Sequence, residues 1–218
     1  VHYGHLRCAE EARQKLNLAR LTLLPSGTPP HRRAPQASVK QRLEMLSLAL
    51  QEFPRLEIDD RETRRSGPSY MVDTLQELRQ ECPRRPLLLL LGQDAASGLH
   101  SWHQWEQLFE LAHLVIMNRP GMKPEYRQDL SKQMERRLSA ELEPLINSTA
   151  GRVLNLQVSP LDISATNQIW RSKSKILPLQ LGNLFGDSRF GQSIKNSCEV
   201  NTRTFSTAIH CVRRIRFR

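Results

Sequence analysis

The chain has 218 residues, and its 39% hydrophobic and 25% charged content is enough to bury a core, which excludes wholesale disorder. Its longest run of strongly apolar residues covers only residues 87–91, so we expect no membrane span and no membrane partner. The net charge is +10, but residues 1–170 hold 22 Lys and Arg against 20 Asp and Glu, and this nearly neutral body argues against a nucleic-acid partner.

Helical and strand patterns alternate at short intervals up to about residue 170. Helices are predicted at residues 5–16, 38–50, 70–80, 102–111 and 125–142, and strands at residues 21–24, 56–59, 87–91, 113–117 and 153–158. Ser38 and Gln41 fit a capping box at the start of the second helix. This alternation predicts an α/β fold with a doubly wound parallel sheet.

The composition changes after residue 170. Residues 171–218 hold 10 Lys and Arg against 2 Asp and Glu, and no apolar period lasts more than two turns. We expect a folded domain over residues 1–170 and a basic tail over residues 171–218 that is either disordered or translated out of frame.

The four cysteines lie far apart in the sequence and form no CxxC pair. Reduced thiols are typical of cytoplasmic proteins, so we predict a cytoplasmic location, with a metal or disulfide role as the lesser alternative. The sequence leaves open whether copies of the chain form a homo-oligomer.

A histidine–glycine segment opens the chain, with His2, Gly4 and His5 at the start of the first predicted helix. Backbone N–H groups at a helix N-terminus bind phosphate oxygens, and the two histidines can donate hydrogen bonds to the same phosphates. The segment therefore predicts an anion site, although surface histidines that cap a helix would give the same pattern.

Two loops that follow predicted strands also carry anion-binding features. Residues 24–33 combine prolines with Arg32 and Arg33 at the carboxyl edge of the sheet, where ligands bind in doubly wound folds. Ser69, in a Gly-Pro-Ser-Tyr segment, is predicted to be an N-cap that leaves helix N–H groups open to an anion. A rigid surface loop and a simple helix cap are the alternatives.

Asp94 directly follows the Leu-rich strand, and Trp102 and His103 come soon after it. A carboxylate beyond a strand end suits a ribose hydroxyl, and an exposed Trp suits stacking on a planar base, whereas core packing is the alternative for the Trp. Ser164 and Thr166 follow the last strand, where small hydroxyl residues favour a phosphate or an ordinary helix cap.

The order of these segments strongly resembles the nicotinate-nucleotide adenylyltransferase family, which belongs to the HxGH nucleotidyltransferases. The resemblance covers about residues 1–166 and includes Arg119 in an Arg-Pro-Gly segment. The most specific part is that segment together with Gly-Gln-Asp at residues 92–94 and Ser-Trp-His at residues 101–103. The resemblance implies a Rossmann-like nucleotidyltransferase fold.

The reaction that the resemblance implies is adenylyl transfer from ATP to nicotinate mononucleotide, which gives nicotinate adenine dinucleotide and pyrophosphate in NAD biosynthesis. The expected partners are these two substrates, with Mg²⁺ bound through the ATP phosphates and no metal ligand from the protein. The mononucleotide phosphate is already an anion, so no side-chain nucleophile is required and catalysis consists of positioning and charge stabilisation.

The resemblance also implies roles for single residues. His2 and His5 correspond to the phosphate-binding histidines, with the larger transition-state role at His5. ATP is expected at Gly4, Asp94, Ser164 and Thr166. The mononucleotide is expected at Arg32, Ser69, Tyr70, Trp102, His103 and Arg119, with Trp102 stacked on the nicotinate ring.

Three departures from the family pattern stand out. Family members have a GGTFDP segment before the histidines that is not found ahead of Val1, so we expect the first strand to be missing and two neighbouring strands to have unpaired N–H and C=O groups. Met71 replaces a Thr, and Arg171 comes two residues late for the closing motif. Because the first strand is expected to be missing, we expect a fragment or a poorly folding chain.

Two other functions stay open from the sequence. One is a non-catalytic, truncated or frameshifted remnant of such an enzyme. The other is a sister HxGH enzyme that uses nicotinamide mononucleotide or pantetheine phosphate, although Trp102 and the Gly-Pro-Ser-Tyr segment weigh against the pantetheine substrate.

Overall fold

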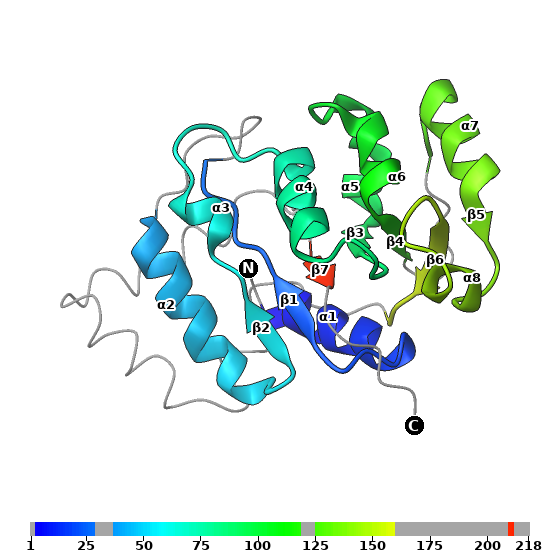
Figure 1. Cartoon of the computed structure of the whole chain (residues 1–218). Helices are drawn as coiled ribbons and strands as arrows, with labels where there is room; N and C mark the ends of the chain where they lie inside the picture. Colours follow the sequence, from blue (N-terminus) through cyan, green and yellow to red (C-terminus); the bar gives the residue numbers. More distant parts are fainter. Residues whose placement is uncertain (1–2, 29–36, 119–124, 160–208, 212–218) are drawn as a thin grey trace. The chain divides into compact units, whose positions relative to one another are not determined.

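The structure is a computed structural model that describes residues 3–28, 37–118, 125–159 and 209–211 (Figure 1). The chain divides into two compact units, and the described residues all belong to the unit formed by residues 1–159 and 206–218. The other unit, residues 160–205, lies outside the described residues, as does the boundary predicted at residue 170.

Helices and strands alternate along the described chain. The α-helices are α1 (Tyr3–Lys15), α2 (Val39–Ala49), α3 (Arg61–Arg64), α4 (Met71–Glu81), α5 (Gln93–Ser97), α6 (Leu108–Leu111), α7 (Gln128–Arg137) and α8 (Glu143–Ile146). Short 3-10 helices occur at η1 (Leu50–Glu52), η2 (Leu99–Ser101) and η3 (Trp105–Gln107). The strands are β1 (Leu21–Leu23), β2 (Leu56–Ile58), β3 (Leu88–Gly92), β4 (His113–Asn118), β5 (Leu138–Ser139), β6 (Val153–Gln157) and β7 (Ile209–Cys211). Within these described elements, no helix has the length and apolar character needed to cross a bilayer.

The strands form one sheet in the order β2-β1-β7-β3-β4-β6-β5. All neighbouring pairs are parallel except the two that involve β7. The central register pairs Leu88 with His113 and Gly92 with Met117. This arrangement confirms the predicted α/β fold with a doubly wound, largely parallel sheet.

Two apolar cores cover the two faces of the sheet. Successive side chains of a strand point to opposite faces, so Leu89 and Leu91 of β3 join one core, while Leu88 and Leu90 join the other. We call the first the aromatic-side core, which α4, α5, α6 and α7 cover, and the second the α1-side core, which α1, α2 and α8 cover. The unbroken run of leucines is thus the signature of a strand that is buried on both faces.

The start of α2 confirms the predicted capping box, whereas the start of α4 does not confirm the predicted cap. The Ser38 hydroxyl accepts from the Gln41 N–H at 3.3 Å, and the Gln41 side chain accepts from the Ser38 N–H at 2.9 Å. The N-cap of α4 is Tyr70, without a side-chain cap hydrogen bond, so the prediction of Ser69 as the N-cap was wrong.

Two predicted helices are shorter in the structure. Residues 102–104 are not helical, because Gln104 adopts a left-handed conformation at φ 49° that ends the turn before η3. The helix predicted over residues 125–142 ends at Arg137, where Leu138 pairs with Val153 of β6. In the second case, pairing with the sheet edge overrides the local helical preference.

The strand β7 lies at the centre of the sheet, between β1 and β3, and runs antiparallel to both. It covers β1 at Thr22 and Leu23 and β3 at residues 88–90. The two edges at which unpaired backbone groups were expected are therefore covered in part. No apolar period in residues 171–218 predicted this strand.

His113, the first residue of β4, is fully buried and neutral. Its Nδ1 accepts the N–H of Arg152 at 3.0 Å, so Nε2 carries the proton and donates to the carbonyl of Ser148 at 3.0 Å. Burial lowers the pKa of His113, and the Arg79 guanidinium acts in the same direction. The two hydrogen bonds form together only with the neutral imidazole, because Nδ1 must accept one of them.

We expect acid to destabilise the protein through His113. Because the folded-state pKa lies below the unfolded value of about 6.5, this stabilisation is complete above about pH 6.5 and is lost as the pH falls below it. The free energy of unfolding in urea should fall between about pH 7 and about pH 5, and it should fall less in His113→Gln than in the wild type. His100→Gln is the control, and an equal loss in the wild type and His113→Gln would contradict the expectation.

Candidate active site

The carboxyl ends of the parallel strands meet at one edge of the sheet, where ligands bind in doubly wound folds. Asp94 lies in the first turn of α5, directly beyond β3, and is exposed. Asn118 ends β4 and is only 8% exposed; its Nδ2 donates to Asn155 Oδ1 at 3.1 Å. The Asn118 Oδ1 has no hydrogen-bond partner in the described part of the chain. This edge thus presents an exposed carboxylate and a buried amide oxygen.

Gly4 and His5 lie in the first turn of α1. Gly4 is buried and His5 is half-buried, and the first turn holds no acidic side chain that would repel an anion. The first four N–H groups of a helix have no partner within the helix, so this turn has the donors and the dipole that bind phosphate. His2 lies outside the described residues.

The loop after β1 is fixed by a guanidinium from α2. Arg42 donates to the Ser26 carbonyl at 2.6 Å and to the Gly27 carbonyl at 3.3 Å. The next residue, Thr28, accepts the N–H of Ser69 at 2.9 Å. We call residues 26–28 the first loop and residues 67–70 the second loop; the two loops are joined through their backbones. Arg32 lies outside the described residues.

Gly27 lies against Glu62 of α3 and Ser69 of the second loop. A Cβ at this position would lie 2.2 Å from the Glu62 carbonyl oxygen and 2.9 Å from Ser69 Oγ. The Ser69 hydroxyl accepts the Thr28 N–H at 3.2 Å and donates to the Glu62 carbonyl at 3.4 Å. Ser69 is 8% exposed, so the structure places its hydroxyl within the loop junction.

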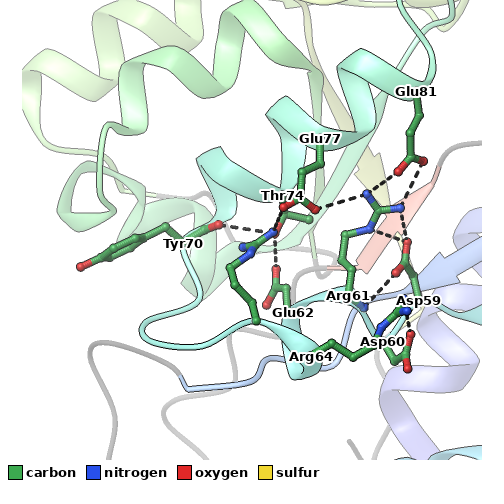
Figure 2. A network of polar contacts seen from close by, with 10 residues as sticks. Asp59, Asp60, Arg61, Glu62, Arg64, Tyr70, Thr74, Glu77 and Glu81 are labelled. Atoms are coloured by element: carbon green, nitrogen blue, oxygen red, sulfur yellow. Dashed lines mark hydrogen bonds and ion pairs between the residues drawn. The ribbon is translucent and has the colours of Figure 1, made fainter.

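The carboxylate of Glu62 lies beside Thr74 of α4 (Figure 2). The side chain is 1% exposed, and it accepts hydrogen bonds from Thr74 Oγ1 at 2.9 Å and from Ser26 Oγ at 3.2 Å. Burial raises the pKa of Glu62. Sequence reasoning missed this residue, because it stands in the charged run of residues 59–65 that is typical of a solvated segment.

Ion pairs surround α3 and hold it in place. Arg61 donates to Asp59 Oδ2 at 2.7 Å and to Glu81 Oε1 at 2.9 Å, as Figure 2 shows. Arg65 donates to Glu77 Oε1 at 2.6 Å. The four-residue helix is therefore bound to the end of β2 on one side and to α4 on the other.

An aromatic surface forms where the second loop meets the segment that follows η2. The rings of Tyr70 and His103 lie 4.3 Å apart and are tilted by 36°. Trp102 is half-buried against the aromatic-side core, as is Trp105, which meets Phe109 edge-on at 6.2 Å. Of Trp102 and Trp105, Trp102 is the one that directly precedes His103 in the chain.

The structure brings several of the predicted residues together and leaves others aside. Tyr70 and His103 are in contact, with Ser69 and Trp102 as their chain neighbours. Gly4 and His5 lie on α1, and Asp94 lies on α5. The predicted residues outside the described ranges are His2, Arg32, Arg119, Ser164 and Thr166.

Clustered metal ligands are not found in this part of the chain. Among the described residues, no group of three or more His, Cys, Asp or Glu side chains is arranged to hold a metal ion.

Comparison with known proteins assigns the family. Residues 1–167 match the cytidylyltransferase-like family. A protein of Aeromonas hydrophila named probable nicotinate-nucleotide adenylyltransferase is 44% identical over 166 residues, which cover 76% of this chain and 78% of the relative. A protein of Halorhodospira halophila with the same name is 45% identical over 166 residues, which cover 76% of each chain.

A solved structure shares the fold. The Plasmodium falciparum nicotinic acid mononucleotide adenylyltransferase complexed with NaAD aligns with a TM-score of 0.51 at 13% identity and covers 75% of this chain and 71% of that chain. The family resemblance drawn from the sequence motifs is confirmed by the curated relatives. The chain therefore belongs to the nicotinate-nucleotide adenylyltransferase family, within the cytidylyltransferase-like proteins.

Proposed function

We propose that this chain transfers the adenylyl group of ATP to nicotinate mononucleotide, with release of pyrophosphate. The observation that carries the proposal is the identity of 44–45% to relatives that bear this enzyme's name, over the same residues that contain the candidate site. We also propose a cytoplasmic location, in keeping with Cys82, which forms no disulfide among the described residues.

In the proposed reaction, a phosphate oxygen of the mononucleotide forms a bond to the α-phosphorus of ATP. The bond from this phosphorus to the bridging oxygen breaks, and the pyrophosphate leaves with the electron pair. Mg²⁺ enters with ATP as part of the substrate. Because the attacking oxygen is already anionic, the protein supplies alignment and charge stabilisation rather than a nucleophile or a base.

We assign the phosphates of ATP to the first turn of α1. Backbone N–H groups at a helix N-terminus bind phosphate oxygens, and His5 of this turn is proposed to donate to the developing negative charge. Asp94 is exposed beyond β3, where it can accept a ribose hydroxyl. His2, Ser164 and Thr166 complete the ATP side of the proposal.

We assign the mononucleotide to the aromatic surface. Trp102 is half-buried against the aromatic-side core and directly precedes His103 in the chain, and a pyridine ring stacks favourably on an indole. Arg32 and Arg119 are proposed to meet its charged groups.

Pyrophosphate release tests this function. The wild type mixed with ATP, Mg²⁺ and nicotinate mononucleotide is expected to release pyrophosphate, and Trp102→Ala to raise the KM for the mononucleotide about tenfold, the order expected for a lost aromatic stack. Trp105→Ala is the matched control, because Trp105 packs against the same core but turns its edge to Phe109.

The same assay separates the alternatives. Faster release with nicotinamide mononucleotide or pantetheine phosphate would identify a sister enzyme. No release with any acceptor, together with no heat of ATP binding in calorimetry, would identify a non-catalytic remnant and contradict the proposal.

A further inference from the structure

Glu62 lies at the point where three segments converge. One carboxylate oxygen accepts the hydroxyl of Ser26 in the first loop, and the other accepts the hydroxyl of Thr74 in α4. The backbone carbonyl of Glu62 accepts the hydroxyl of Ser69 in the second loop. A single residue thus contacts the first loop, the second loop and the helix that follows it.

The second loop cannot move independently of the first. Thr28 and Pro68 form a parallel β-bridge, and the Ser69 N–H donates to the Thr28 carbonyl at 2.9 Å. The Thr28 N–H in turn donates to Ser69 Oγ at 3.2 Å. A shift of the first loop is therefore expected to move Ser69 and, with it, Tyr70, which follows Ser69 in the chain.

Glu62 itself is fixed by its neighbours rather than by its helix, which has only four residues. Arg61 joins the end of β2 to α4 through Asp59 and Glu81 (Figure 2). These ion pairs do not involve the two loops: among the described hydrogen bonds, none joins Asp59 or Glu81 to Ser26 or Ser69. They anchor α3, while Glu62 makes the contacts to the loops.

We propose that Glu62 is a positioning residue for the mononucleotide: it holds the first loop through Ser26 and α4 through Thr74, and thereby sets the place of the Tyr70 ring. This inference rests on the proposed function. A side chain that is 1% exposed is not open to a substrate, so Glu62 acts through the residues that it binds. The helix turn proposed for ATP lies on α1 and shares none of these contacts.

A purely structural role and a positioning role predict different kinetics. Loss of general stability lowers the amount of active enzyme and leaves both KM values unchanged. Loss of position at Tyr70 raises the KM for the mononucleotide and leaves the KM for ATP unchanged, because only the mononucleotide is proposed to meet this ring.

The test compares Glu62→Leu, Glu62→Gln and the control Glu81→Leu. Glu62→Leu removes both acceptors and is expected to raise the KM for the mononucleotide about tenfold, with the KM for ATP within about twofold of the wild type. Glu62→Gln keeps a polar partner for each hydroxyl, and its KM for the mononucleotide is expected to lie within about twofold of the wild-type value. Glu81→Leu removes a neighbouring carboxylate whose hydrogen bonds among the described residues come from Arg61, and it is expected to leave both KM values unchanged.

The outcomes are distinct. The proposal is overturned if Glu62→Leu raises both KM values equally, if it behaves like Glu81→Leu, or if Glu62→Gln is as impaired as Glu62→Leu. Should Glu62→Leu fail to fold by circular dichroism, Ser26→Ala removes the same loop contact, and an unchanged KM for the mononucleotide in that variant overturns the proposal. Failure of the proposed function is seen separately, as an inactive wild type.

Discussion

Replacing Gly27 with alanine is expected to lower the free energy of unfolding by about 3 kcal/mol, at the upper end for an overpacked site. The added Cβ would lie 2.2 Å from the carbonyl oxygen of Glu62, a backbone atom that cannot rotate away. The first loop would have to separate from α3, which would also break its hydrogen bonds with Ser69. Urea unfolding gives the stability, and the KM for the mononucleotide should rise in the same variant.

Gly98→Ala is the matched control for this substitution. Gly98 follows α5 with a negative φ, and a Cβ there would lie 3.6 Å from the nearest atom, the Asp94 carbonyl oxygen, which is ordinary contact. Its unfolding free energy is expected to stay within about 0.5 kcal/mol of the wild type. A Gly27→Ala protein as stable as Gly98→Ala would show that the first loop separates from α3 at no cost in stability.

Placing proline at position 210 is expected to destabilise the sheet by several kcal/mol. His210 is the central residue of β7 and pairs with Thr22 on one side and Leu89 on the other. Proline has no N–H and fits poorly within a central strand, and each buried backbone group that loses its partner costs about 1–3 kcal/mol. Thermal unfolding followed by circular dichroism gives the loss.

His210→Ala separates the backbone effect from the side chain, because it keeps the N–H that proline removes. We expect it to unfold within a few degrees of the wild type, well above His210→Pro. Equal midpoints for the alanine and proline variants would mean that the pairing of β7 contributes nothing to the stability of the sheet.

The parallel strands could be predicted from the sequence, because short apolar runs between helical periods have few alternatives. The run of residues 87–91 is too short for a buried helix and too apolar for a solvated strand, and it forms β3. The capping box of Ser38 and Gln41 was equally local, since both partners lie within four residues. Such signals need no knowledge of the rest of the chain.

Features that depend on distant contacts could not be predicted. The burial of Glu62 depends on Thr74 and Ser26, which lie 12 and 36 residues away, and the local sequence is that of an exposed charged segment. The strand β7 pairs across more than 100 residues and carries no periodic pattern. Gln104 adopts its left-handed turn inside a segment with a helical apolar pattern.

For the candidate site, the sequence indicated residues but not their surroundings. Tyr70 and His103 were predicted separately, and only the fold places their rings 4.3 Å apart. Ser69 was predicted to cap α4, whereas its hydroxyl accepts the N–H of Thr28 in the first loop and donates to the Glu62 carbonyl. Motif order identified the family, and packing decides which groups remain open to a ligand.

The two apolar cores have a consequence for how such an enzyme can diverge. Tyr70 and Trp102 pack against the aromatic-side core, whereas α1 packs against the α1-side core through Leu6 and Ala9. Under the proposed assignment, the residues around each substrate rest on a different apolar core, one on each face of the sheet, and the two substrates meet at the carboxyl edge of the sheet. Substitutions in the aromatic-side core can then change which acceptor substrate is preferred during evolution, while the binding of the ATP triphosphate is conserved.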